Sequence, residues 1–182
     1  MKIVYQGKTK TGKEIIIRYP QLGDEVEMLK FINQISDEKT FIRYQGEHET
    51  LESEVKYLES VLNAIRNQKE VRLLVLSNNQ LIASTDIHLL DKTEKHIGIF
   101  GIIISKDFRG EGLGTLLMEL ILKEAERELN ELRIATLEVY ATNKVAQALY
   151  RKMGFIEYGK LPNGVMRCGV FEDRLMMYKN IR

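Results

Sequence analysis

Three glycines at alternate positions, Gly110, Gly112 and Gly114, stand between an apolar run and a helical pattern. The run Ile97–Ile104 is almost continuously apolar, as in a buried strand, and leucines recur at helical spacing from about Gly112 to Leu129. Glycine lets the backbone approach a ligand closely, and the first N–H groups of a helix have no carbonyl partner within it. Because these groups and the helix dipole attract anions, the spacing predicts a phosphate-binding loop.

This loop fits neither of the common nucleotide-binding fingerprints. In the dinucleotide pattern G-x-G-x-x-G, Thr115 or Leu117 stands where the third glycine belongs, and Ile134 stands where an acidic ribose-binding residue is expected. The nucleoside-triphosphate loop fails too, because no Gly-Lys-Ser/Thr follows. Lys106 and Arg109 add positive charge at the same corner. Three spaced glycines alone are equally compatible with a simple glycine-rich turn.

A second motif decides between these interpretations. The loop matches in full the pattern Arg/Gln-x-x-Gly-x-Gly/Ala of the GNAT acetyltransferases, and reads Arg109-Gly110-Glu111-Gly112-Leu113-Gly114. That family carries Asn-x-x-Ala-x-x-Leu-Tyr-x-x-x-Gly-Phe further along, and the matching residues are Asn143, Ala146, Leu149, Tyr150, Gly154 and Phe155. The chain therefore resembles the GNAT superfamily, most sharply over residues 95–160. It is most similar to the bacterial branch of ribosomal-protein and small-amine acetyltransferases.

The resemblance implies acetyl-CoA as the co-substrate and no metal. The backbone of Ile102, Ile103 and Ile104 is expected to pair with the pantetheine amides, as if the coenzyme were an added strand. The loop is expected to hold the pyrophosphate by backbone N–H groups, over Arg109, Gly110, Glu111, Gly112, Leu113, Gly114 and Thr115. Asn143 is expected to contact the coenzyme near the pantetheine arm, and Tyr150 to protonate the departing thiolate.

Helical geometry agrees with these implied roles. Asn143 and Tyr150 are seven residues apart, which is about two turns, and Ala146 lies between them on the same face. Two polar groups and one small residue suit the wall of a narrow thioester channel. An N-cap role for Asn143 and a packed helix tyrosine at position 150 are the alternatives. The opposite face is expected to enter the core, and carries Val145, Leu149 and Met153.

The expected reaction is direct transfer in a ternary complex, where a neutral primary amine attacks the thioester carbonyl. A backbone N–H near Ile104 meets the oxyanion, and Tyr150 gives its proton to the leaving thiolate. An alkyl ammonium has a pKa of about 10, so it must lose a proton first. Glu138 is the candidate catalytic base. Further candidates, for which a surface or strand-edge role is the alternative, are Glu172, Asp173 and His96.

The rest of the chain supplies the elements that position these residues. Residues 1–20 predict an N-terminal β-hairpin, and Asp24 and Thr50 are expected to cap two helices. Strands are expected near Val71–Leu76, Leu81–Leu90, Ile97–Ile104, Ile134–Ala141, Phe155–Lys160 and Gly169–Tyr178, with a helix over Lys144–Met153 and a turn-rich loop over Leu161–Arg167. This order predicts an α+β (α/β mixed-sheet) fold with helices on both faces. No linker or repeat divides the chain, so one domain over residues 1–182 is expected.

Composition excludes several classes of function. The 27 Lys and Arg residues and 26 Asp and Glu residues give a net charge of +1, which offers no basis for binding nucleic acid or an anionic membrane. No apolar stretch approaches the roughly 20 residues of a membrane-spanning helix. Cys168 is the only cysteine, so no disulfide framework is expected. The absence of such a framework favours a cytoplasmic location. An exposed sheet edge is compatible with a homodimer.

The acceptor is left open by the sequence. A polyamine, an amino-acid or antibiotic amine, and a protein N-terminus all fit the expected chemistry. An acidic stretch favours a polycation, although an acidic helix start explains it equally well; it comprises Glu47, Glu49, Glu52 and Glu54. The alternative to an enzyme is an acyl-CoA-binding sensor or scaffold, but such a module has no need for Tyr150 as an acid.

Overall fold

The computed structural model describes residues 2–182 and contains an eight-stranded sheet in the order β1-β2-β3-β4-β5-β6-β8-β7. The strands are β1 (Ile3–Lys8), β2 (Glu14–Arg18), β3 (Glu70–Ser77), β4 (Gln80–Leu89), β5 (Ile97–Ile104), β6 (Ile134–Tyr140), β7 (Ile156–Arg167) and β8 (Val170–Asn180). The helices are α1 (Glu25–Asp37), α2 (Leu51–Arg66), α3 (Leu113–Glu128) and α4 (Lys144–Lys152). Among the residues described, no helix is long and apolar enough to cross a membrane.

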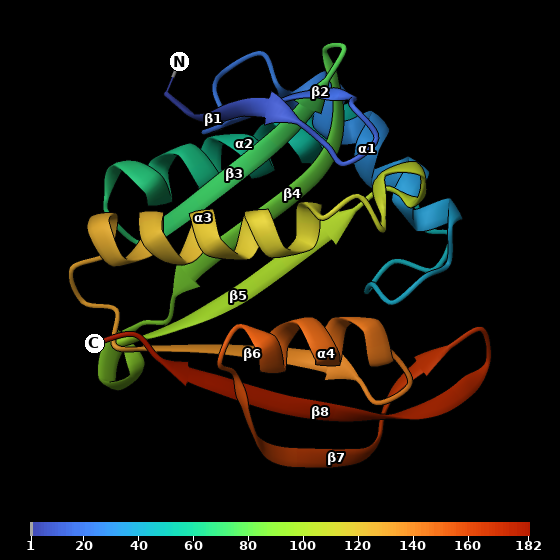
Figure 1. Ribbon diagram of the computed structural model, residues 1–182, viewed down its shortest axis with the longest axis vertical. Coiled ribbons are helices and arrows are strands. Elements are labelled where there is room, and N and C mark those ends of the chain that lie inside the picture. Colours follow the sequence, from blue (N-terminus) through green and yellow to red (C-terminus); the bar gives the residue numbers. More distant parts are fainter. Residues whose placement is uncertain (1) are drawn as a thin grey trace.

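Helices cover both faces of this sheet (Figure 1). The α3 and α4 face holds a core of 24 buried residues, whereas the α1 and α2 face holds a core of six. Successive side chains of a strand point to opposite faces, so Leu73 enters the larger core and Leu74 the smaller one. The pair β5–β6 is parallel and its neighbours are antiparallel. The predicted mixed sheet with helices on both faces is confirmed.

The two predicted helix caps turn out differently. Thr50 caps α2 as predicted, because its hydroxyl accepts a hydrogen bond from the Ser53 N–H at 3.2 Å and Ser53 Oγ accepts one from the Thr50 N–H at 3.0 Å. Asp24 stands at the start of α1 but makes no side-chain cap. Its carboxylate instead accepts two hydrogen bonds from the buried Arg18 guanidinium, at 2.6 and 2.7 Å. A buried cation needs a charged partner, and this need takes the carboxylate away from the helix.

The final hairpin is longer than the sequence predicted. The expected loop over 161–167 is part of β7, which runs to Arg167 and turns through Cys168 and Gly169 into β8. The register between the two strands shifts between Leu161 and Val165, so Pro162 lies in the irregular segment. Because β7 is the outermost strand, a proline without an N–H is tolerated there.

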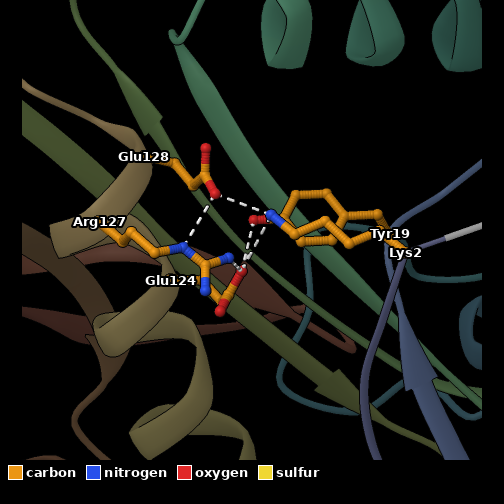
Figure 2. A network of polar contacts seen from close by, with 5 residues as sticks. All are labelled: Lys2, Tyr19, Glu124, Arg127 and Glu128. Carbon is orange, nitrogen blue, oxygen red and sulfur yellow. Dashed lines mark hydrogen bonds and ion pairs between the residues drawn. The ribbon is translucent and has the colours of Figure 1, made fainter.

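A buried polar network joins the N-terminal hairpin to α3 (Figure 2). The Tyr19 hydroxyl donates a hydrogen bond to Glu124 Oε2 at 2.9 Å, and both residues are buried. Arg127 pairs with the same carboxylate, and Lys2 lies 3.4 Å from it and 2.7 Å from Glu128. Burial and the Glu124 carboxylate raise the pKa of Tyr19, so its hydroxyl stays protonated and keeps donating.

Replacing Tyr19 with phenylalanine is expected to lower the free energy of unfolding by about 1–2 kcal/mol, because a hydrogen bond to a charged group is lost. Urea unfolding with linear extrapolation measures the change. Tyr158→Phe, in which the altered hydroxyl is exposed, is the matched control and should change stability by less than about 0.5 kcal/mol. Equal effects of the two variants would contradict a role for the buried network.

Candidate active site

Strands β5 and β6 separate shortly after they begin. They pair through Ile97–Ile99 and Ile134–Thr136, and beyond this stretch they diverge (Figure 1). On its other side β5 stays paired with β4 as far as Ile104. From Phe100 onward, therefore, one edge of β5 has backbone groups that no neighbouring strand uses. This free edge includes the backbone of Ile102 and Ile104, which face the same side as that of His96 and Gly98, and an extended ligand with amide groups can pair with it. The N–H and C=O of Ile103 face β4 instead, as those of Ile97 and Ser105 do.

The glycine loop follows directly at the end of this edge. Gly112 is the residue before α3 and has a φ of +84°, in the left-handed region that favours glycine. No hydrogen bond among residues 2–182 uses the N–H groups of residues 110–112, and the first turn of α3 has no intrahelical partners for its own. A Cβ at Gly114 would lie 2.9 Å from Leu149 of α4, so the helix start packs closely on α4. The loop thus presents free N–H donors beside a helix N-terminus.

The tip of the N-terminal hairpin holds this loop through Glu111. The Glu111 carboxylate accepts hydrogen bonds from the Thr11 N–H at 3.1 Å and the Thr11 hydroxyl at 2.7 Å, and pairs with Lys13 at 3.2 Å. The Thr11 hydroxyl is the main cause that lowers the pKa of Glu111 to about 2. The side chain is therefore engaged within the protein, and Glu111 has only its backbone to offer a ligand.

The other end of the loop is tied to the C-terminal end of α1. Arg109 Nε donates to the Ile104 carbonyl at 2.8 Å, and its guanidinium pairs with Glu38. Glu38 also accepts a hydrogen bond from the Lys106 N–H at 3.1 Å. The charge of Arg109 therefore serves first to fasten the loop. Neither Glu38 nor Thr11 carried a sequence signal, because each lies about 70 to 100 residues away from its partner in the loop.

Helix α4 brings Asn143 and Tyr150 to the diverging strands. Asn143 Oδ1 accepts the Ala146 N–H at 3.2 Å, so the N-cap role is present. Tyr150 is 8% exposed, and its ring lies 5.9 Å from that of Phe100, the first residue beyond the β5–β6 pairing. Among residues 2–182 its hydroxyl has no hydrogen-bond partner, and burial raises its pKa to about 12. Tyr150 therefore offers a protonated and unused donor.

The expected core face of α4 is only partly correct. Val145 is 84% exposed and does not enter the core, whereas Leu149 and Met153 pack against the larger core. The buried side chains of this helix are Gln147 and Tyr150. Gln147 Nε2 donates to the carbonyl groups at the end of β6, at 2.9 and 3.1 Å. Those carbonyls need a donor, which accounts for a buried polar side chain at position 147.

A cavity of about 440 Å³ lies on the opposite face of the sheet, under α1 and α2. Much of its lining is apolar, from Met28, Phe31, Ile32, Leu74, Leu81 and Ile103. Ile103 belongs to β5, so the cavity reaches the strand that carries the free edge. The polar lining comprises Tyr44, Glu49, Ser53, Glu54, Tyr57, Arg72, Ser84 and Asp86. Apart from the two glutamates, the sequence analysis missed these polar residues, because they come from separate elements that only the fold brings together.

Some charged groups of this cavity have hydrogen-bond or ion-pair partners within the protein, and one does not. Arg72 donates to Glu70 at 2.7 Å and lies 3.3 Å from Asp86. Glu49 accepts a hydrogen bond from the Tyr44 hydroxyl at 2.7 Å. Glu54 is 5% exposed and, among residues 2–182, its carboxylate has no hydrogen-bond or ion-pair partner. Burial and the nearby Glu49 raise the pKa of Glu54.

The four predicted base candidates lie outside this lining. Glu138 is about half exposed, pairs with Arg174 at 2.9 Å, and shares a face of β6 with Tyr140. The carboxylate of Glu172 pairs with Arg167, and that of Asp173 pairs with Lys160. Both border a second, more open cavity of about 640 Å³ beside the exposed Cys168. His96 accepts the Arg133 N–H at 2.8 Å through its backbone carbonyl. The role of Glu138 as a base stays a prediction.

Known proteins match both the sequence and this geometry. Spermidine N(1)-acetyltransferase of Escherichia coli K12 is 26% identical over 153 residues, which cover 84% of this chain and 81% of the relative. A GNAT-family acetyltransferase structure from Streptococcus pneumoniae is 28% identical, with a TM-score of 0.84 over 93% of this chain and 100% of its own. A putative acetyltransferase of Salmonella typhimurium, solved with acetyl-CoA, is 15% identical with a TM-score of 0.78, covering 92% and 94%.

A family model covers most of the functional region described above. The model of the "Acetyltransferase (GNAT) family" matches residues 30–155, which include the C-terminal part of α1, all of α2, the free edge of β5, the glycine loop and α4. The match spans more than half of the 182 residues. The resemblance that the two motifs indicated is thereby confirmed, and the chain belongs to the GNAT family of acetyltransferases.

Proposed function

We propose that this protein transfers the acetyl group of acetyl-CoA to a primary amine, by direct attack of the amine on the thioester. The observation that carries the proposal is the free edge of β5, which ends at a glycine loop with unused N–H donors. A strand edge suits the amide groups of pantetheine, and the loop suits a pyrophosphate. Membership of the GNAT family and a Salmonella typhimurium relative solved with acetyl-CoA support this assignment.

The coenzyme site is built mainly from backbone. Ile102 and the N–H of Ile104 supply backbone groups along the free edge, and residues 110–115 supply N–H groups around the helix start. Gly114 lets the start of α3 pack closely on Leu149 of α4, so the glycine loop and α4 lie next to each other beside β5. Asn143 completes this wall, because a cap that uses one lone pair of its amide oxygen leaves its NH₂ group available.

Tyr150 acts as the acid in this proposal. The amine nitrogen forms the new bond to the acetyl carbon, the thioester C–S bond breaks, and the hydroxyl gives its proton to the departing thiolate. The nitrogen gives up one proton in turn, and a proton returned to the phenolate restores the hydroxyl. A backbone N–H on the free edge of β5 stabilises the oxyanion. Burial suits Tyr150 to this role, because its raised pKa of about 12 keeps the proton in place until a base forms beside it.

The amine approaches from the cavity under α1 and α2, which reaches β5 at Ile103. It must lose a proton before it attacks, since an alkyl ammonium has a pKa of about 10. Glu138 remains the base that the sequence analysis named, and Glu138→Gln tests it. A homodimer likewise remains an expectation from the exposed apolar residues of β7 and β8.

Replacing Tyr150 with phenylalanine is expected to lower kcat by roughly 100-fold to 10,000-fold, because the leaving thiolate loses its proton donor. The ring contacts with Phe100 and Phe155 are kept, so the KM for acetyl-CoA should change little. Free-thiol release with pooled amines and pooled short peptides measures the rate. In the wild type, Tyr150 should cause no alkaline loss of rate until the pH approaches about 12.

The control is Tyr158→Phe on the exposed edge strand, which should keep full turnover. A Tyr150→Phe protein that binds acetyl-CoA and turns over at the wild-type rate would remove Tyr150 from the mechanism. Coenzyme binding by the wild type without thiol release from any amine would instead favour a sensor that only binds the coenzyme.

Replacing Glu111 with alanine is expected to raise the KM for acetyl-CoA about tenfold with little change in kcat, because the loop loses its attachment to Thr11 and Lys13. Removing a negative charge beside a phosphate site would by itself lower the KM, so the direction separates the two effects. Glu111→Gln keeps an acceptor for Thr11 and should give an intermediate KM. Glu126→Ala, an exposed change of equal charge on α3, is the control.

A further inference from the structure

The cavity under α1 and α2 contains a buried carboxylate without a partner. Glu54 is 5% exposed, and no side chain or backbone group of residues 2–182 donates to its carboxylate. Burying an ionised carboxylate without a cation or a hydrogen-bond donor is unfavourable. Water or a bound ligand supplies the missing partner of such a group. The Glu54 oxygens are not sealed from the cavity, so they are free to accept from a cationic or donating group inside it.

A second polar group of the same cavity is also unused. The Ser84 hydroxyl is buried and has no hydrogen-bond partner among residues 2–182. It lies on β4, opposite Leu74 of β3 and Ile103 of β5 in the register of the sheet. Two unsatisfied polar side chains from different elements, α2 and β4, therefore face one cavity. Their chemistry, one carboxylate and one hydroxyl, suits an ammonium better than it suits an anion.

The cation of the cavity is not available to a ligand. Arg72 is held between Glu70 and Asp86, and its guanidinium lies 5.3 Å from the centre of the Tyr57 ring. A carboxylate on the ligand would therefore find no free cation, and would lie near Glu49 and Glu54. The remaining lining is largely aliphatic and aromatic, and a volume of about 440 Å³ is in the range of small-molecule sites.

We propose that this cavity binds the acceptor amine through an ion pair between its ammonium group and Glu54, and that the acceptors are amines with an apolar body and no carboxylate. This inference rests on the proposed acetyl transfer and names its substrate class. It separates apolar alkyl and arylalkyl amines from free amino acids, which share the amine but carry a carboxylate beside it. The Ser84 hydroxyl, which lines the same cavity and has no partner among residues 2–182, is a further hydrogen-bonding group for the ligand.

Three ligands with one ring and one amine test the class: phenethylamine, phenylalanine amide and phenylalanine. Calorimetry with wild-type protein, with acetyl-CoA absent, measures their binding apart from any chemistry. We expect phenethylamine and the amide to bind, and phenylalanine to bind at least about 100-fold more weakly, because its carboxylate is buried near other carboxylates. Binding of phenylalanine as tight as that of phenethylamine would overturn the inference.

The matched variants are Glu54→Gln inside the cavity and Glu52→Gln on the exposed side of the same helix. Glu54→Gln should weaken phenethylamine binding at least about tenfold and leave the KM for acetyl-CoA unchanged, whereas Glu52→Gln should change neither. An unchanged phenethylamine affinity in a folded Glu54→Gln protein would also overturn the proposed ion pair with Glu54. If Glu54→Gln fails to fold, Ser84→Ala replaces it, with weaker amine binding as the expected result.

Turnover then separates this inference from the proposed function. Thiol release with phenethylamine but not with phenylalanine supports both. Selective binding of phenethylamine without thiol release supports the cavity assignment and contradicts acetyl transfer to this class. Thiol release with phenylalanine at the same kcat/KM as with phenethylamine supports acetyl transfer and overturns the substrate class proposed here.

Discussion

The short pairing between β5 and β6 is the constraint on which the active site depends. A central strand normally uses its backbone groups on both sides, and unused groups inside a protein are unfavourable unless water or a ligand completes them. Here the pairing stops after Ile99, and the rings of Phe100, Tyr150 and Phe155 contact one another where it stops. The same aromatic cluster therefore supports the divergence of the strands and fixes the position of the tyrosine. Without the divergence, neither the free edge nor the access to Tyr150 would exist.

In the proposed reaction, strand β5 also separates the two ligands. Its free edge and the glycine loop after it offer backbone to the coenzyme, whereas Ile103 points into the cavity under α1 and α2. The loop is held by two residues that lie far from it in the sequence, Glu38 at the end of α1 and Thr11 in the first hairpin. The position of a short local motif is thus set by long-range polar contacts, which leave the N–H groups of residues 110–112 unused.

Much of the coenzyme side could be predicted from the sequence, because its signals are local. Alternate glycines before a helix and the spacing of Asn143 and Tyr150 describe single elements, and the cap at Thr50 is likewise a four-residue pattern. Predictions failed where the surroundings in the fold decide the role of a residue. Asp24 pairs with the buried Arg18 and does not cap its helix, and Pro162 fits a strand because β7 is at the edge of the sheet. Helix α4 buries Gln147, which donates to the end of β6, and leaves Val145 exposed. Glu54 looked like an ordinary acidic residue in a first helical turn, and only the folded sheet shows that it is buried without a partner.

The unequal cores on the two faces of the sheet have a consequence for motion. The core on the α3 and α4 face has 24 buried residues, whereas the core on the α1 and α2 face has six, and α1 and α2 cover the cavity proposed for the acceptor. Local unfolding requires less free energy where fewer apolar contacts must be broken. The backbone amides of α1 and α2 should therefore exchange with deuterium before those of α3, through openings that leave the sheet intact. Such openings would give a buried cavity a route for ligand entry, so the smaller core sets how fast an acceptor can come and go.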